Sequence, residues 1–154
     1  MRASEHGSTV HATAIVIGET GILIRGKSGS GKSSLARELV AGAENGGRYA
    51  ALVSDDRVLL RHAGGRLIAS TVSPVAGLLE MRGLGIVPVP HEPAAVLRLV
   101  VDLADEPPRM PDPDATIASV EGVALPRITV NRALGAGVVL WTLGQLRDGF
   151  VTVP

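Results

Sequence analysis

The residues with the clearest chemical potential are those from 26 to 33, a run rich in glycine and serine that contains two lysines. They match the pattern G-x-x-x-x-G-K-[ST], which is typical of loops that bind nucleotide phosphates. Glycines let main-chain amides turn inward around an anion, and the N-terminus of the following helix adds partial positive charge. Lys32 is placed to reach the β- and γ-phosphates, and the Ser33 hydroxyl to bind magnesium. The expected nucleotide-binding residues are Gly26, Lys27, Ser28, Gly29, Ser30, Gly31, Lys32 and Ser33.

Acidic residues further along the chain are candidates for magnesium binding or proton transfer. Asp55 and Asp56 follow the apolar run 50–53, and an acid at the end of the strand after a phosphate loop often lies near the phosphates. Adjacent strand residues point to opposite sides, so one carboxylate is expected to face the phosphate, and an Asp-rich turn is the structural alternative. Glu80 stands two residues before Arg82, and its pattern alone fits a surface salt bridge as well as a functional site.

Short apolar segments, separated by glycines and prolines, must position these side chains. Strand, glycine loop, helix and strand in this order predict an α/β fold. The expected elements are strands at 14–17 and 22–24 joined by a turn, a helix at 33–41 closed by Gly42, a strand at 50–53, a hairpin from 58–60 and 67–69, a short helix at 74–81, a strand at 96–103 with a helix as the alternative, an irregular loop at 106–114, a strand at 128–130 and a helix at 133–146.

The amino-acid composition argues against several classes of protein. A length of 154 residues with 45% hydrophobic residues fits one packed domain. One Trp, one Tyr and one Phe argue against a base-stacking platform, and a net charge of zero argues against binding to nucleic-acid backbones. The absence of cysteine excludes disulfides and thiolate chemistry. No apolar run approaches the ~20 residues of a membrane span, and residues 1–9 do not resemble a signal peptide, so we expect a cytoplasmic protein without a membrane or nucleic-acid partner.

Several of these segments together resemble one known family, the C-terminal catalytic domain of HPr kinase/phosphorylase. The resemblance is carried by His11, the phosphate loop fifteen residues later, the aspartate pair in 52–58 and the run Glu-Met-Arg-Gly-Leu-Gly-Ile at 80–86. It covers about residues 11–130 and implies a P-loop in a mixed β-sheet with flanking helices, with an active site like that of phosphoenolpyruvate carboxykinase. It also implies one catalytic domain over residues 1–154, without the N-terminal domain of longer members, as in truncated α-proteobacterial forms.

The resemblance implies an activity as well. Family members use ATP and Mg²⁺ to phosphorylate a serine of HPr, the phosphocarrier of the sugar phosphotransferase system. In many members the same site removes that phosphate by attack of inorganic phosphate. The loop linked to this reverse reaction is matched here by residues 131–137, which are few and poor in charge. The family is typically hexameric, so the resemblance implies a homo-oligomer.

Five of the candidate positions receive roles from the resemblance. Lys32 matches the phosphate-loop lysine, and Ser33 and Glu80 match the two magnesium ligands. The pair Asp55 and Asp56 matches the acid that takes the proton from the serine, and Asp56 is the preferred member. This acid returns the proton during the reverse reaction.

Two further residues come from the resemblance alone. His11 matches a histidine of the family's active site, and Arg109 matches a catalytic arginine if one extra residue is allowed in that segment. An arginine on a proline-rich loop suits a transient contact with the transferring phosphate. Two other functions fit the phosphate loop, namely a kinase for a small metabolite and a nucleotide-sensing module without chemistry.

Overall fold

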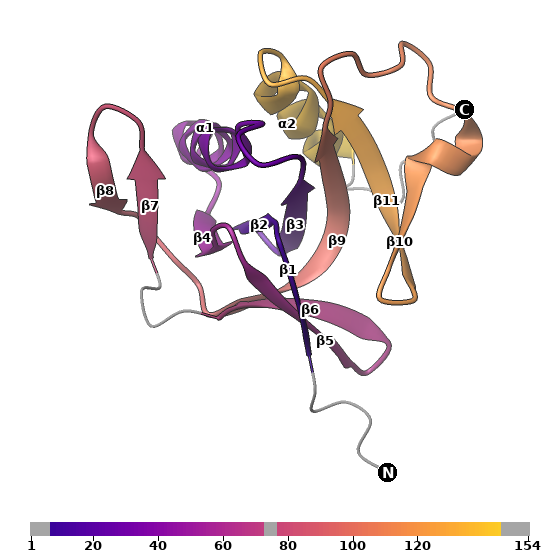
Figure 1. The fold of residues 1–154 in the computed structure, drawn as a ribbon, viewed down its shortest axis with the longest axis horizontal. Helices are drawn as coiled ribbons and strands as arrows, with labels where there is room; N and C mark the ends of the chain where they lie inside the picture. Colours follow the sequence, from indigo (N-terminus) through magenta and orange to yellow (C-terminus); the bar gives the residue numbers. More distant parts are fainter. Residues whose placement is uncertain (1–6, 73–76, 146–154) are drawn as a thin grey trace.

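The computed structural model describes residues 7–72 and 77–145, which form a curled β-sheet with two helices on one face (Figure 1). The mixed α/β class expected from the sequence is confirmed. The elements are β1 (Ser8–Val10), β2 (Thr13–Ile17), β3 (Thr20–Arg25), α1 (Lys32–Asn45), β4 (Ala50–Ser54), β5 (Val58–Ala63), β6 (Arg66–Thr71), β7 (Leu78–Met81), β8 (Gly85–Pro88), β9 (Ala94–Leu103), the 3-10 helix η1 (Pro113–Thr116), β10 (Ile117–Val120), β11 (Val123–Val130) and α2 (Gly135–Gln145).

The strand before the phosphate loop, β3, lies inside the sheet. It pairs in parallel with β9 and antiparallel with β2. On the outer sides, β4 pairs antiparallel with β2, and β11 pairs in parallel with β9. Consequently β3, β4, β9 and β11 all end at one edge of the sheet, and β2 begins there. We call this edge the carboxyl edge, and Figure 1 shows β3, β9 and β11 ending there beside the helices.

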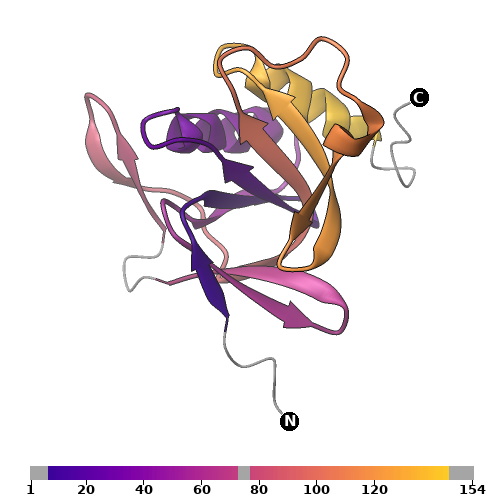
Figure 2. The same cartoon turned by 45° about the vertical axis from the view of Figure 1, so that its right-hand side comes forward.

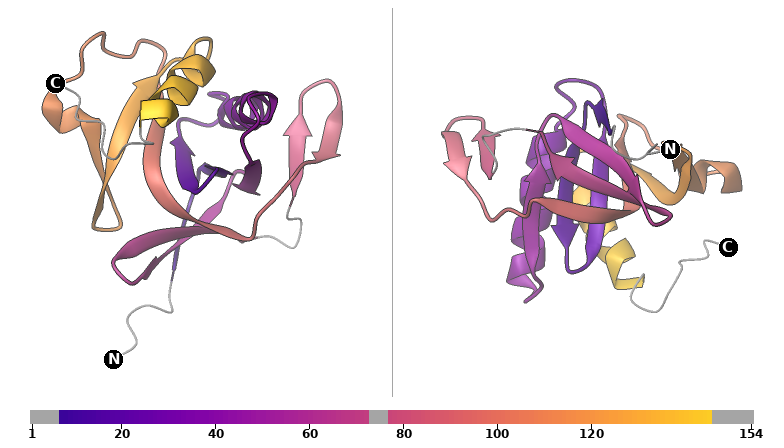
Figure 3. Two further views of the ribbon diagram at one scale, coloured as in Figure 1. Left: turned by 180° about the vertical axis from the view of Figure 1, so that it is seen from behind. Right: turned by 90° about the horizontal axis from the view of Figure 1, so that it is seen from below.

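The long strand β9 connects the two halves of the sheet. Its residues 94–96 pair with β6, whereas residues 97–102 pair with β3. The sheet therefore curls, so that β5 and β6 cross beneath the other strands, as the right-hand view of Figure 3, seen from below, shows. The strand β5 begins at Val58, two residues after Asp56.

Both faces of the central strands are buried, which explains why these strands read as continuous apolar runs. One core lies between the sheet and the two helices and contains Ile22, Ile24 and Leu35. The other core lies between the central strands of the sheet and the strands β5, β6 and β10, which curl over their opposite face. It contains Leu23 and Leu60. Two-sided burial holds the strands that carry the candidate site rigidly in register.

The expected end of the first helix at Gly42 is wrong, because α1 continues to Asn45. A Cβ on Gly42 would lie 2.9 Å from Leu140 Cδ1 of α2, so this glycine serves the close approach of the two helices. The helix ends at Gly46, and Gly47 follows with a φ of 78°. Tertiary packing, and not helix termination, accounts for the first glycine.

The short helix expected at 74–81 is also wrong over the part that the structure describes. Residues 78–81 form β7, which pairs antiparallel with β8 in a separate two-stranded sheet, and residues 73–76 lie outside the described residues. Leu79 is buried between the exposed Leu78 and Glu80, which is the period of a strand. Pro113 and Asp114, expected in an irregular loop, begin η1.

The remaining predicted elements have the expected type of secondary structure, but their bounds differ from the prediction. The antiparallel hairpin of β5 and β6 is confirmed, and β9 is a strand and not a helix. The last helix begins at Gly135, and residue 146 lies outside the described residues. Three short strands, β1, β8 and β10, were not expected from the sequence. In the described part of the chain, neither helix has the length and apolar character that a bilayer crossing needs.

Candidate active site

The phosphate loop connects the end of β3 to the start of α1 at the carboxyl edge. Gly29 and Gly31 have φ values of 79° and 100°, a region that residues with a Cβ rarely adopt. A Cβ on Gly26 would lie 2.5 Å from Ser30 Oγ and 3.1 Å from the Cβ of Leu103. The motif glycines are therefore required by both backbone conformation and space. Ser30 Oγ is buried and has no hydrogen-bond partner in the described residues, as expected of a cradle shaped for a ligand.

Lys32 lies under this loop with only 7% of its surface exposed. Its Nζ donates hydrogen bonds to the carbonyl oxygens of Gly26, at 3.0 Å, and Lys27, at 3.1 Å. A lysine ammonium has three N–H donors, and these two bonds hold it against the inner side of the loop. The third N–H donor could bind an anion in the loop.

Asp55 links three elements at the carboxyl edge. Its Oδ1 accepts hydrogen bonds from the hydroxyls of Ser33, at 2.7 Å, and Thr13, at 2.9 Å. Asp55 follows β4, Ser33 lies in the first turn of α1, and Thr13 is the first residue of β2. A carboxylate beside a hydroxyl is a donor set that Mg²⁺ accepts, and magnesium usually takes one or two carboxylates together with phosphates. In the described residues, no three or more His, Cys, Asp or Glu side chains are grouped so that they could hold a metal ion.

Asp56 faces a different partner. Its Oδ1 lies 2.6 Å from Nε2 of His11, and the side chains of His11 and Asp56 are 52% and 70% exposed, respectively. Asp56 has a φ of 68°, a conformation that is uncommon for residues other than glycine. This left-handed turn separates the two neighbouring aspartates, so that Asp55 contacts the phosphate loop and Asp56 remains accessible to solvent. The sequence left open which of the two would face the phosphate.

Glu80 and Arg109 lie away from these contacts. Glu80 is on the exposed side of β7, and Arg109 is exposed in the segment between β9 and η1. Within residues 7–72 and 77–145, no hydrogen bond or ion pair joins either side chain to the phosphate loop or to Asp55. Figure 2 shows that the β7–β8 hairpin and the segment leading to η1 lie on opposite sides of the molecule.

The structure also reveals a charged cluster that the sequence analysis did not identify. Asp102, at the end of β9, accepts two hydrogen bonds from Arg25, at 2.7 and 2.8 Å, and another from Nε of Arg127. Burial alone would raise the pKa of Asp102, but the hydrogen bonds from both arginines outweigh it and lower the pKa. The available signal was one carboxylate within the apolar residues 99–103, at the end of the strand beside the phosphate loop. Thr13 carried a similar signal, as a hydroxyl that is fully buried in an apolar run.

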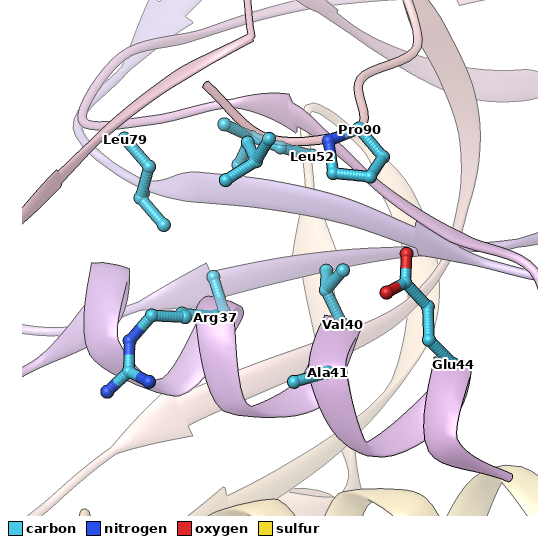
Figure 4. Close-up of a pocket in the computed structure, with 9 residues that line it drawn as sticks. Arg37, Val40, Ala41, Glu44, Leu52, Leu79 and Pro90 are labelled. Atoms are coloured by element: carbon cyan, nitrogen blue, oxygen red, sulfur yellow. The ribbon is translucent and has the colours of Figure 1, made fainter. Parts of the chain in front are cut away.

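An apolar cavity of about 170 Å³ lies between α1 and the β7–β8 hairpin. Figure 4 shows Leu52, Leu79 and Pro90 on one side of it and Val40 and Ala41 of α1 on the other. None of the candidate site residues lines this cavity. It marks incomplete packing of the hairpin against α1 and is separate from the carboxyl edge.

Comparisons with known proteins identify the family to which the chain belongs. The family model "HPr Serine kinase C-terminal domain" matches residues 3–93. HPr kinase/phosphorylase from Clostridium tetani is 43% identical over 81 residues, which are 53% of this chain and 25% of that protein. The protein of the same name from Neisseria meningitidis is 35% identical over 106 residues, which are 64% of this chain and 31% of that protein. The matches thus span about a quarter to a third of these curated relatives.

A solved structure extends the similarity over almost the whole chain. The Hpr(Ser) kinase/phosphatase from Coxiella burnetii superposes with a TM-score of 0.72 and 28% sequence identity. The superposition covers 93% of this chain and 99% of that chain. The curled sheet with its two helices is therefore an architecture that this kinase/phosphatase shares.

Proposed function

Because the chain belongs to the family of HPr serine kinase C-terminal domains, we propose that it transfers the γ-phosphate of ATP to a serine hydroxyl of the phosphocarrier HPr. The observation that carries this proposal is the convergence at the carboxyl edge. There Lys32 lines the phosphate loop, Asp55 holds the Ser33 hydroxyl, and Asp56 stands exposed beside His11. These contacts support a site for phosphates with an exposed carboxylate in the same part of the molecule for proton transfer.

The phosphate loop would hold the substrate's triphosphate. Its main-chain amides and the N-terminus of α1 supply partial positive charge, and Lys32 supplies a full charge that the fold already holds in place. Ser33 and Asp55 would hold Mg²⁺. When bound, Mg²⁺ neutralises charge on the phosphate oxygens. Since phosphoryl transfer requires little covalent work from the protein, this positioning supplies most of the rate enhancement.

Asp56 is the proposed general base. As the serine oxygen bonds to the γ-phosphorus and the bond to the leaving ADP oxygen breaks, the serine proton passes to the Asp56 carboxylate. Contact with Nε2 of His11 orients this carboxylate. An exposure of 70% suits a base that must meet a hydroxyl on the surface of another protein. In the reverse reaction, with inorganic phosphate as the nucleophile, the same carboxylate would return the proton.

Glu80 and Arg109 complete the proposal. Following the positions of the resemblance, we assign Glu80 as a magnesium ligand beside Ser33 and Asp55, and Arg109 as a contact for the transferring phosphate. Both side chains are exposed and are not engaged in hydrogen bonds or ion pairs within the described parts of the chain. We also propose that the protein acts in the cytoplasm as a homo-oligomer, with the hexamer of the family as the expected form.

The decisive experiment is mass spectrometry of HPr from the same organism after incubation with this protein, ATP and Mg²⁺. We expect one added phosphate on a serine, and a strongly reduced rate of addition when Asp56→Asn replaces the wild-type protein. Asp112→Asn is the matched control, because Asp112 is an exposed aspartate outside the site. Tight ATP binding without transfer to HPr would instead favour a nucleotide-sensing module, and transfer only to a metabolite would favour a small-molecule kinase.

A further inference from the structure

A second cavity, of about 210 Å³, adjoins the phosphate loop on the side away from the aspartate pair. It lies between the loop, the end of β9 and the segment after β11. Strand order explains its place, because β2 and β4 flank β3 on one side whereas β9 and β11 flank it on the other. The residues that line it are Lys27, Ser30, Leu103, Ala104, Asp105 and Arg132.

The walls of this cavity are held by specific contacts. The amide of Ala104 donates to the carbonyl oxygen of Val130, at 2.9 Å, which ties the chain after β9 to the end of β11. The Arg132 side chain lies against Gly31, where an added Cβ would be 2.6 Å from Cδ of Arg132. The same guanidinium donates to Glu38 Oε1 of α1, at 2.9 Å. The cavity is therefore a built feature of the fold.

Charges of both signs line the cavity. Lys27 belongs to the phosphate loop, Arg132 lies against Gly31 of that loop, and Asp105 follows the end of β9. Within the described residues, the Asp105 carboxylate takes part in no hydrogen bond or ion pair, although two cations line the same cavity. It therefore remains available as an acceptor for hydroxyl groups.

The direction of a bound nucleotide follows from the proposed function. The γ-phosphate must lie near Asp56, because the proton acceptor has to reach the attacking serine. The rest of the nucleotide must then leave the loop on the opposite side, where β9 and β11 end. A cavity of about 210 Å³ is smaller than the roughly 300 Å³ of pockets that enclose a whole small molecule. It matches one part of the nucleotide, the sugar next to the phosphates.

We propose that this cavity is the ribose subsite, in which Asp105 accepts hydrogen bonds from the 2′- and 3′-hydroxyls of the nucleotide. A carboxylate is a suitable acceptor for paired sugar hydroxyls, and dinucleotide-binding folds use one for the same purpose. Lys27, in the phosphate loop, and Arg132, against Gly31, also line the subsite. The inference rests on the proposed function, because it requires a nucleotide in the phosphate loop. It adds a selection for ribonucleotides that no phosphate contact supplies.

Calorimetric titration in the presence of Mg²⁺ tests the subsite with three probes: ATP, 2′,3′-dideoxy-ATP and inorganic tripolyphosphate. The wild-type protein should bind ATP about tenfold more tightly than dideoxy-ATP, the effect of hydrogen bonds to a charged acceptor. Asp105→Ala should lower the ATP affinity by about the same factor and leave the other two affinities unchanged. Asp112→Ala is the control, because this aspartate lies in the same segment but does not line the cavity.

Two results would overturn the ribose subsite. One is equal affinity of the wild-type protein for ATP and dideoxy-ATP, and the other is an equal loss for all three probes in Asp105→Ala. Failure of the proposed function looks different, since neither ATP nor tripolyphosphate would then bind, or bound ATP would not phosphorylate HPr. Phosphorylation of HPr with equal efficiency from ATP and dideoxy-ATP would reject the subsite alone.

Discussion

Two regions that carry candidate residues differ in how completely the fold has already organised them. At the carboxyl edge, Lys32 and Asp55 each make two hydrogen bonds to neighbouring groups, and Ser33 is bonded to Asp55. In the β7–β8 hairpin, by contrast, Glu80 is exposed. The hairpin packs on α1 through Leu79, with an apolar cavity beside it.

The difference shows which groups the fold of this chain organises by itself. Strands paired on both sides hold the phosphate-binding groups in register, so these groups are arranged before a ligand arrives. The hairpin is a separate two-stranded sheet without such support. We therefore expect substitutions at the edge to act on groups that are already in place, and substitutions in the hairpin to act only once substrate and metal are bound.

The largest effect is expected at Asp56, the exposed member of the edge. Asp56→Asn removes the proton acceptor and should lower kcat for HPr phosphorylation by roughly 10²- to 10⁴-fold, with ATP affinity nearly unchanged. Asp55→Asn should weaken binding of Mg-ATP instead, because Asp55 holds Ser33. Steady-state kinetics and calorimetry on both variants separate the two roles. Full activity in both single variants and in the double variant would contradict the assignment.

A somewhat smaller effect is expected at Lys32, the most buried charge of the edge. Lys32→Met should lower kcat/KM by roughly 10²- to 10³-fold, the usual effect of removing one placed donor from a developing negative charge. Phosphate transfer from labelled ATP measures it. Arg61→Gln on β5 is the control for charge alone, because Arg61 is exposed and far from the loop in sequence. An unchanged rate in Lys32→Met would show that the buried ammonium serves only the loop carbonyls.

A substitution at Glu80 tests directly whether the β7–β8 hairpin contributes to the active site. Glu80→Gln should reduce activity at low Mg²⁺ by about 10- to 100-fold, the range for supporting groups at metal sites, and high Mg²⁺ should restore part of it. Glu19→Gln, in the exposed turn between β2 and β3, is the matched control. A rate independent of Glu80 at every Mg²⁺ concentration would remove the hairpin from the site and leave the carboxyl edge as the complete one.

The smallest effect concerns the stability of the edge. Asp102→Asn leaves Arg25 and Arg127 without their shared carboxylate and should lower the free energy of unfolding by about 1–2 kcal/mol, as measured by urea denaturation. The lowered pKa of Asp102 means that its ion pairs stabilise the fold above the ordinary pKa of 3.8 and are lost as the pH falls below it. The wild-type protein should therefore lose more stability than the variant on acidification. Parallel acid curves for the two proteins would contradict this account.

Local patterns predicted much of the site. Fixed glycine and lysine positions identify the phosphate loop because they reflect local backbone requirements, and an apolar run ending in acids locates the strand of Asp55 and Asp56. Gly42 was misread because helix termination and close helix packing both select glycine, and only Leu140 on a distant helix distinguishes them. The strand at 78–81 was misread because its pairing partner, β8, supplies the structure that its own residues do not prescribe.

By itself, the sequence determined the phosphate loop, the apolar strands around it and the family to which these residues point, since each depends on residue types at short and fixed spacing. Only the tertiary structure decided that Asp55 faces Ser33 whereas Asp56 faces His11, and that Asp102 accepts hydrogen bonds from two arginines. These outcomes depend on strand order and on one left-handed backbone turn. Such contacts join residues between 22 and 77 positions apart. Over this separation, a local sequence pattern does not predict how two side chains lie relative to each other.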